Sequence, residues 1–190
     1  AIKAENFTGK SGTWVDSYSA KGRLIAVGLG CRPQKLDLRK TGGRLVRRLS
    51  KNRVAKFWVG DVKGCRLSQE EIAHNVAFGM LLGSYRFDKY FTRKPAEDYP
   101  VLEKVYFDSA EKDKISLGDF VDMASLANAV RYARDLVNEP ANFLTPEAFA
   151  SDVERLRYLK LDVEILDERE LRKQDFNMLL EVAKGSEARP

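Results

Sequence analysis

The sequence predicts an α/β protein in which strands and helices alternate and the sheet has substantial parallel character. Short apolar runs that suit buried strands are separated by segments with helical periodicity. A capping motif marks the first turn of one of these helices. Because parallel strands need long crossover connections, this alternation favours a sheet covered by helices.

The first part of the chain contains two predicted strands with a helix between them. The unbroken apolar run Leu24–Leu29 predicts a strand that is buried on both faces. In the segment 43–50, apolar side chains fall on one helical face and arginines on the other. The β-branched and aromatic segment Val54–Val59 predicts the next strand, which ends at Gly60.

A capped helix, a third strand and a long helix follow. Ser68 and Glu71 have the spacing of a capping box, in which each side chain bonds the other residue's backbone N–H. The helix that they open has apolar residues at every fourth position, and Gly83 ends it. The segment Val101–Phe107 predicts a strand, and residues 117–137 predict a long amphipathic helix.

Pro140 ends the long helix and separates a smaller second part of the chain. Thr145 and Pro146 suit the cap and first turn of a helix that we expect to reach Leu159. The remaining predicted elements are a strand at Asp162–Leu166, a short helix near Glu168 and an apolar strand at Met178–Val182. Because so small a part buries too little apolar surface to stand alone, we expect the natural protein to continue beyond Pro190.

The composition is that of a globular protein with a mild positive charge. The 190 residues include 33 Lys and Arg against 28 Asp and Glu, a net charge of +5. The longest apolar run, Leu24–Cys31, has eight residues, whereas a helix needs about 20 to cross a bilayer, so no membrane partner is expected. No apolar secretory stretch opens the sequence, and Cys31 and Cys65 are isolated, which indicates free thiols in a reducing cytoplasm.

Few residues suit a catalytic, metal or phosphate site. His74 is the only histidine, and its place in the middle of a predicted helix favours a structural role. Residues 4–11 (AENFTGKS) fit the loose form of a phosphate-binding loop but lack the strand and helix that such a loop needs. Gly28 and Gly30 follow a strand, as in a dinucleotide motif, but Pro33 stands at the third glycine position, which favours a simple turn.

A basic stretch leaves two interpretations open. Residues 32–56 contain ten Lys or Arg and one acidic residue, Asp37. A basic helix face can contact the phosphates of a nucleic acid. A solvated amphipathic surface predicts the same pattern, and we favour it. The candidate nucleic-acid-binding residues are Arg44, Arg47, Arg48 and Lys51.

Two long motifs are similar to hallmarks of one enzyme family. They are Gly79–Tyr90 (GMLLGSYRFDKY) and Ala133–Pro146 (ARDLVNEPANFLTP). Both resemble motifs of the leucyl aminopeptidase (cytosol aminopeptidase) family, and they occur in the expected order. The closing segment 161–186 also looks like the first part of that family's catalytic domain. The likeness spans the chain from about Val54 to its end.

The resemblance implies a bilobal metallo-exopeptidase that removes N-terminal residues, often leucine, from peptides. Residues 1–137 are then an N-terminal macro-like domain, a mixed sheet flanked by helices, which includes a connecting helix at about 117–137. Residues 138–190 are the truncated start of a second α/β domain, the metallopeptidase catalytic domain. In the complete protein that domain binds two divalent metal ions, commonly zinc, manganese or magnesium. The resemblance also implies a homohexamer, and we expect a cytoplasmic location.

No residue of this chain matches the catalytic or metal-binding residues of the family. They lie in motifs resembling GKGITFDSGG and NTDAEGRL, and neither string occurs in the 190 residues. We therefore name no catalytic and no metal-binding residue, and we expect the span to bind no metal and to be inactive alone. Its expected role is structural, in subunit contacts and in limiting substrate access. The alternative is a DNA-binding module, because some bacterial members of the family also bind DNA.

Overall fold

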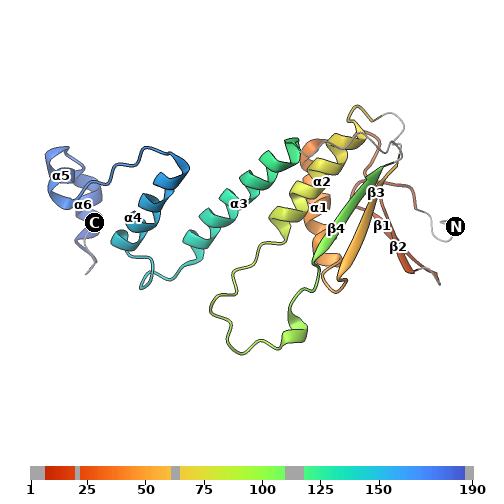
Figure 1. The fold of residues 1–190 in the computed structure, drawn as a ribbon, viewed down its shortest axis with the longest axis horizontal. Helices are drawn as coiled ribbons and strands as arrows, with labels where there is room; N and C mark the ends of the chain where they lie inside the picture. Colours follow the sequence, from red (N-terminus) through yellow and green to blue (C-terminus); the bar gives the residue numbers. More distant parts are fainter. Residues whose placement is uncertain (1–6, 20–21, 61–64, 110–117, 187–190) are drawn as a thin grey trace. The chain divides into compact units, whose positions relative to one another are not determined.

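A computed structural model describes residues 7–19, 22–60, 65–109 and 118–186 of the chain (Figure 1). The chain forms two packing units, residues 1–131 (unit 1) and residues 132–190 (unit 2). Unit 1 holds two short sheets flanked by helices, and the described part of unit 2 is helical. This confirms the predicted mixed α/β class.

Among the described residues, each sheet of unit 1 is two strands wide. Strands β1 (Trp14–Ser19) and β2 (Gly22–Val27) form an antiparallel hairpin. Strands β3 (Val54–Val59) and β4 (Lys104–Ser109) are parallel, with Val54 opposite Lys104. The parallel pair confirms the predicted parallel character, whereas β1 was not foreseen because its sequence, WVDSYS, has too few apolar residues to stand out.

Strand β2 is not buried on both faces, which corrects the interpretation of the apolar run Leu24–Leu29. Leu24 is 55% exposed, and the strand ends at Val27. Val27 of the strand packs against the buried cluster, as does Leu29 just after it. Apolar composition alone did not distinguish a strand covered on one face from a strand covered on both.

Helix α2 (Gln69–Gly83) begins as the sequence predicts. The Glu71 backbone N–H donates to the Ser68 hydroxyl at 3.0 Å, and the Ser68 N–H donates to the Glu71 carboxylate at 3.1 Å. Helix α1 (Lys35–Arg48) starts about two turns earlier than expected. The Gln34 N–H donates to the Asp37 carboxylate at 3.2 Å and fixes this earlier start.

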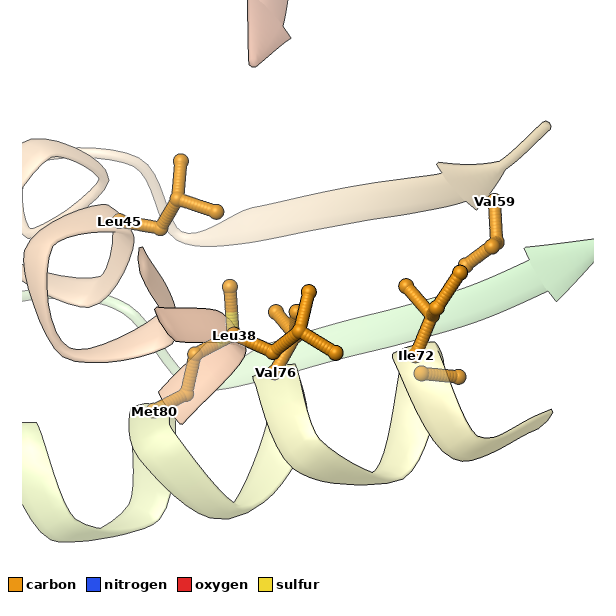
Figure 2. Close-up of a cluster of buried hydrophobic side chains, with 7 residues drawn as sticks. Leu38, Leu45, Val59, Ile72, Val76 and Met80 are labelled. Carbon is orange, nitrogen blue, oxygen red and sulfur yellow. The ribbon is translucent and has the colours of Figure 1, made fainter. Parts of the chain in front are cut away.

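The core of unit 1 lies between α1, α2 and the strands. Figure 2 shows side chains from both helices and from β3 meeting in one cluster. Ile72, Val76 and Met80 recur along one face of α2, as the helical spacing predicts. The rings of Phe57 and Phe107, 5.3 Å apart, join the two parallel strands next to this cluster. The labelled cluster residues are Leu38, Leu45, Val59, Ile72, Val76 and Met80.

Glycines let α1 and α2 cross with their backbones in contact. A Cβ atom placed on Gly42 would lie 2.0 Å from the Val76 carbonyl oxygen, and one on Gly79 would lie 2.0 Å from the Arg39 carbonyl oxygen. A Cβ on Gly83 would lie 2.6 Å from the Cα of Gly43. These distances leave no room for any side chain, so this crossing requires glycine at positions 42, 79 and 83.

Asp16 ties the β1–β2 hairpin to α1. Its carboxylate accepts a hydrogen bond from Arg23 Nε at 2.8 Å and also pairs with Arg48 of α1. The Arg48 guanidinium lies 5.5 Å from the centre of the Trp14 ring. Partial burial raises the pKa of Asp16, but hydrogen bonds and charges from Arg48 and Arg23 outweigh it and hold that pKa below its ordinary value.

Helix α3 (Gly118–Asn138) follows, close to the predicted 117–137. In unit 2, α4 (Pro146–Glu154) and the 3-10 helix η2 (Arg155–Leu159) together fill the helix predicted from Pro146 to Leu159. Thr145 caps α4 as expected, since its hydroxyl accepts the Ala148 N–H at 3.3 Å. The short helix near Glu168 is α5 (Glu168–Lys173).

Both strands predicted in unit 2 are wrong. Residues 162–166 have no regular secondary structure, and Met178–Val182 lies inside the helix α6 (Asn177–Ala183). A strand needs a hydrogen-bonded neighbour, and the described part of unit 2 contains none. In a helix, the backbone N–H and C=O groups of the segment that contains Met178 can hydrogen-bond to one another without a neighbouring strand.

We expect Gly42→Ala to lower the free energy of unfolding by roughly 1–3 kcal/mol or more, because its Cβ would overlap a backbone carbonyl of α2. The neighbouring Gly43→Ala is the matched control. Its Cβ would meet only atoms 3.5 Å away or more, so helix propensity should make it neutral or stabilising by up to about 1 kcal/mol. Denaturant unfolding of both variants checks this, and equal effects would contradict the backbone crossing.

We expect Asp16→Asn to cost about 1 kcal/mol of stability at neutral pH, since partly exposed ion pairs contribute little individually. Because the folded-state pKa of Asp16 is lowered, its contribution is complete above the unfolded pKa of about 3.9 and disappears as the pH falls through the folded-state value. Unfolding curves of the two proteins should therefore converge in acid. Glu103→Gln, which breaks a more exposed pair with Arg53, is the control and should cost less. A constant Asp16→Asn deficit down to about pH 2 would argue against this role.

Candidate functional site

No metal site is assembled among the residues that the structure describes. Within them, no three His, Cys, Asp or Glu side chains are grouped so as to hold an ion. His74 lies in α2 at 5% exposure, with its ring 6.3 Å from that of Phe120, which agrees with a structural role. Cys31 is exposed and Cys65 half-buried, both as free thiols. These residues do not fit a dinuclear metal centre.

The two glycine-containing loops bind each other rather than forming a phosphate cradle. The Gly30 N–H donates to the Gly9 carbonyl at 2.9 Å, and the Gly12 N–H donates to the Gly28 carbonyl at 3.1 Å. A Cβ on Gly28 would lie 2.3 Å from the Lys10 carbonyl oxygen. The segment 9–13 then leads into β1 and not into a helix. The glycines therefore permit a close crossing of two loops, which the sequence did not predict.

The four candidate nucleic-acid-binding residues lie in the second half of α1 or just after it. Arg48 pairs with Asp16, and Lys51 donates to the Glu97 carbonyl. Arg47 Nε donates to the Gly43 carbonyl at 3.2 Å within the helix. The Arg44 guanidinium lies beside Gly12, 2.9 Å from where a Cβ on that residue would be. These contacts give the basic residues roles in folding, and nothing in the structure supports nucleic-acid binding.

The motif Gly79–Tyr90 is built into the packing of unit 1. Its glycines make the crossing with α1, and the segment after them is fixed by Arg131 of α3. Arg131 Nη2 donates to the Leu81 carbonyl at 2.7 Å and to the Ser84 hydroxyl at 2.6 Å. The sequence did not single out Arg131, because its partners lie about 50 positions away.

The loop that follows α2 gathers aromatic rings and cations. The rings of Phe87 and Tyr90 lie 5.8 Å apart, and the Arg86 guanidinium lies 5.1 Å from the centre of the Tyr99 ring. A pocket of about 400 Å³ beside this loop is lined by Arg47, Lys51, Arg86 and Asp98, among others. Arg47 lies in the last turn of α1, where positive charge is favoured. Lys51 donates to the Glu97 carbonyl and Arg86 pairs with Asp88, so these cations have partners within unit 1.

Unit 2 offers apolar surface rather than reactive groups. A groove of about 490 Å³ is lined mainly by apolar side chains of α4, α5 and α6. Twelve large apolar side chains in the described part of this unit are exposed, among them Val137, Phe143, Phe149, Tyr158, Met178 and Val182. Exposed apolar surface of this extent is typical of a region that contacts further protein. None of the helices in the described part of the chain is long and apolar enough to cross a membrane.

Two models of one protein family match the chain in order. The N-terminal domain of the cytosol aminopeptidase family matches residues 1–94, and the catalytic domain of that family matches residues 131–190. A probable cytosol aminopeptidase from Agrobacterium fabrum is 38% identical over 200 aligned residues, which cover 100% of this chain and 39% of that protein. One from Caulobacter vibrioides is 34% identical over 194, covering 98% of this chain and 38% of that protein. The chain thus spans about two-fifths of their length.

Solved structures are similar as well. The bottromycin maturation enzyme BotP, in complex with Mn, matches with a TM-score of 0.74 and 29% identity, over 97% of this chain and 39% of that chain. A mutant of tomato leucine aminopeptidase matches with a TM-score of 0.72 and 24% identity, over 97% of this chain and 37% of that one, a likeness of fold. The two domain matches, their order and these relatives agree with the motifs at residues 79–90 and 133–146. The chain belongs to the cytosol aminopeptidase family.

Proposed function

We propose that this chain is the N-terminal domain and the first part of the catalytic domain of a metallo-aminopeptidase that removes N-terminal residues from peptides. The observation that carries the proposal is the match of both family domains, in order, within one chain. The presence of both domains supports an enzyme more strongly than a separate binding module, because a binding module would not need part of a catalytic domain. The similarity to BotP in complex with Mn supports a metal-dependent activity.

The division of the chain between the two domains is part of this proposal. Residues 1–137, with the connecting helix at about 117–137, form the macro-like domain, and residues 138–190 begin the catalytic domain. The boundary between the packing units at 131 and 132 and the start of the catalytic-domain match at 131 support a division in this region. The connecting helix corresponds to α3.

In this proposal the 190-residue span is structural, and the chemistry belongs to the rest of the polypeptide. Two divalent ions, manganese or zinc, activate water for the hydrolysis in the complete protein, which acts in the cytoplasm as a homohexamer. The absence of the strings GKGITFDSGG and NTDAEGRL from the sequence supports the assignment of the catalytic and metal-binding residues to another part. The exposed apolar side chains of unit 2 support a role in contacts with further protein.

We expect the 190-residue chain, confirmed by intact mass, to hydrolyse leucine p-nitroanilide with added Mn²⁺ no faster than a protein-free control. The Agrobacterium fabrum relative at its full length is the positive control, since this chain covers 39% of it. Absorbance of released p-nitroaniline measures the rate. Turnover that rises in proportion to the concentration of the purified chain would contradict the assignment of the metal site to another part.

A further inference from the structure

A pocket of unit 1 lies where the end of α1, the end of α2 and the loop from α2 to β4 come together. Its volume is about 400 Å³, and pockets of about 300–1,000 Å³ commonly hold small molecules. Residues from three segments line it, within 46–51, 83–86 and 98–102. Because these segments are distant in the sequence, the pocket exists only in the folded unit.

The charged side chains of this pocket do not balance. Of the described residues that line it, Arg47, Lys51 and Arg86 are cations, and Asp98 is a carboxylate. Three positive charges minus one negative charge give the lining a formal charge of +2. The carboxyl end of a helix acts as about half a negative charge, so the ends of α1 and α2 together do not cancel this excess. The pocket therefore attracts negative ions.

The contacts of Arg47 and Lys51 within unit 1 use only part of their hydrogen-bonding capacity. Arg47 Nε donates to the Gly43 carbonyl at 3.2 Å, and the Lys51 ammonium donates to the Glu97 carbonyl. A guanidinium has five N–H donors and an ammonium group has three. Both side chains therefore have further N–H groups that can donate to a ligand, while the existing contacts orient them.

Arg86 is oriented by two neighbours. Its Nε lies 3.5 Å from the Asp88 carboxylate, and its guanidinium lies 5.1 Å from the centre of the Tyr99 ring. Arginine binds oxyanions well because its planar fork of donors can make two parallel hydrogen bonds to one anionic group. A ring that fixes the plane of the guanidinium lowers the entropy that is lost when such a group binds.

Other donors already bond carbonyl groups at the ends of the two helices. The Leu81 carbonyl of α2 accepts from Arg131 Nη2 at 2.7 Å and from the Ser84 hydroxyl at 2.9 Å. The Arg47 carbonyl of α1 accepts the Ser50 N–H at 3.3 Å. These carbonyl groups therefore do not compete with a ligand for the cations of the pocket.

Apolar side chains also line the pocket. They are Val46 of α1 and, in the loop, Pro100 and Leu102. A ligand that carries an apolar group beside its negative charge can remove this surface from water, which an inorganic ion cannot do. The lining thus favours an organic anion over a bare ion.

We propose that this pocket binds a small organic molecule with two negative charges on oxygen, either a phosphomonoester or a dicarboxylate. Arg47, Lys51 and Arg86 donate to its oxygen atoms. Two negative charges match the formal charge of +2, and a phosphomonoester carries about −1.5 to −2 near pH 7. An amino acid could pair its ammonium group with Asp98, but it has no net charge and would leave the excess uncompensated. The inference concerns unit 1 alone and does not rest on the proposed aminopeptidase function.

Isothermal titration calorimetry of the 190-residue chain with phenyl phosphate and with succinate tests the proposal. At about pH 7.5, where a phosphomonoester is mostly a dianion, we expect at least one of them to bind with a Kd below about 1 mM. Added salt should weaken this binding because it screens the charges. Inorganic phosphate should bind more weakly than phenyl phosphate, and leucine should bind more weakly than both dianions. The dianion that binds more tightly names the source of the ligand's charge.

A matched pair of lysine variants makes the test specific to the pocket. Lys51→Gln removes a cation of the pocket and should raise the Kd of the tighter dianion about tenfold, as the loss of a charged hydrogen bond does. Lys40→Gln makes the same change at an exposed position of α1 that does not line the pocket, and should change the Kd less than about twofold. Arg47→Gln is a second pocket variant, and circular dichroism confirms that each variant folds.

Asp98→Asn should act in the opposite direction. It removes the carboxylate from the lining and raises the formal charge of the pocket, so the dianion should bind more tightly, by at least about twofold. If the pocket instead held an ammonium group of the ligand against Asp98, the same variant would weaken binding.

Four outcomes would overturn the proposal. Neither dianion binds with a Kd below about 1 mM, or leucine binds as tightly as the dianions. Lys51→Gln raises the Kd no more than Lys40→Gln, which would assign binding to the general positive charge of the chain. Asp98→Asn fails to tighten binding. None of these readouts depends on hydrolysis, so the proposal can fail while the proposed aminopeptidase function stands, and the reverse also holds.

Discussion

The backbone contact between α1 and α2 is the constraint on which the rest of unit 1 depends. Gly42 on one helix and Gly79 on the other bring main-chain atoms together without intervening side chains. The close approach places Leu38 and Leu45 of α1 against Val76 and Met80 of α2, in the cluster that β3 covers. Because α1 also carries Arg48, the same crossing fixes where the hairpin is attached through Asp16.

The sequence predicted helices and strands correctly where the local signals agreed with the tertiary packing. The capping box at Ser68 placed α2, and the β-branched segment Val54–Val59 placed β3 without error. It failed where the outcome depends on a distant partner. The segment Met178–Val182 is apolar enough for a strand, yet without a neighbouring strand in the described part of unit 2 it forms a helix. Pattern alone cannot supply that neighbour.

The same distinction explains the candidate site. The motifs at residues 79–90 and 133–146 identified the family, because long specific strings carry more information than composition. The basic helix face remained ambiguous in the sequence, since the partner of Arg48 lies 32 positions away in a strand that was not foreseen. The motif that pointed to an enzyme therefore serves packing in this span, and the residues that looked able to bind a ligand hold the fold together.

His74 gives this chain a native reporter of its own core. It is the only histidine in the sequence, lies in the middle of α2 and is 5% exposed beside the ring of Phe120. Chemical modification of imidazole would therefore report on His74 alone. The imidazole resonances in a proton NMR spectrum would likewise come from this one ring. The accessibility of that single ring measures how often α2 loosens from its surroundings, in a chain that needs no engineered label.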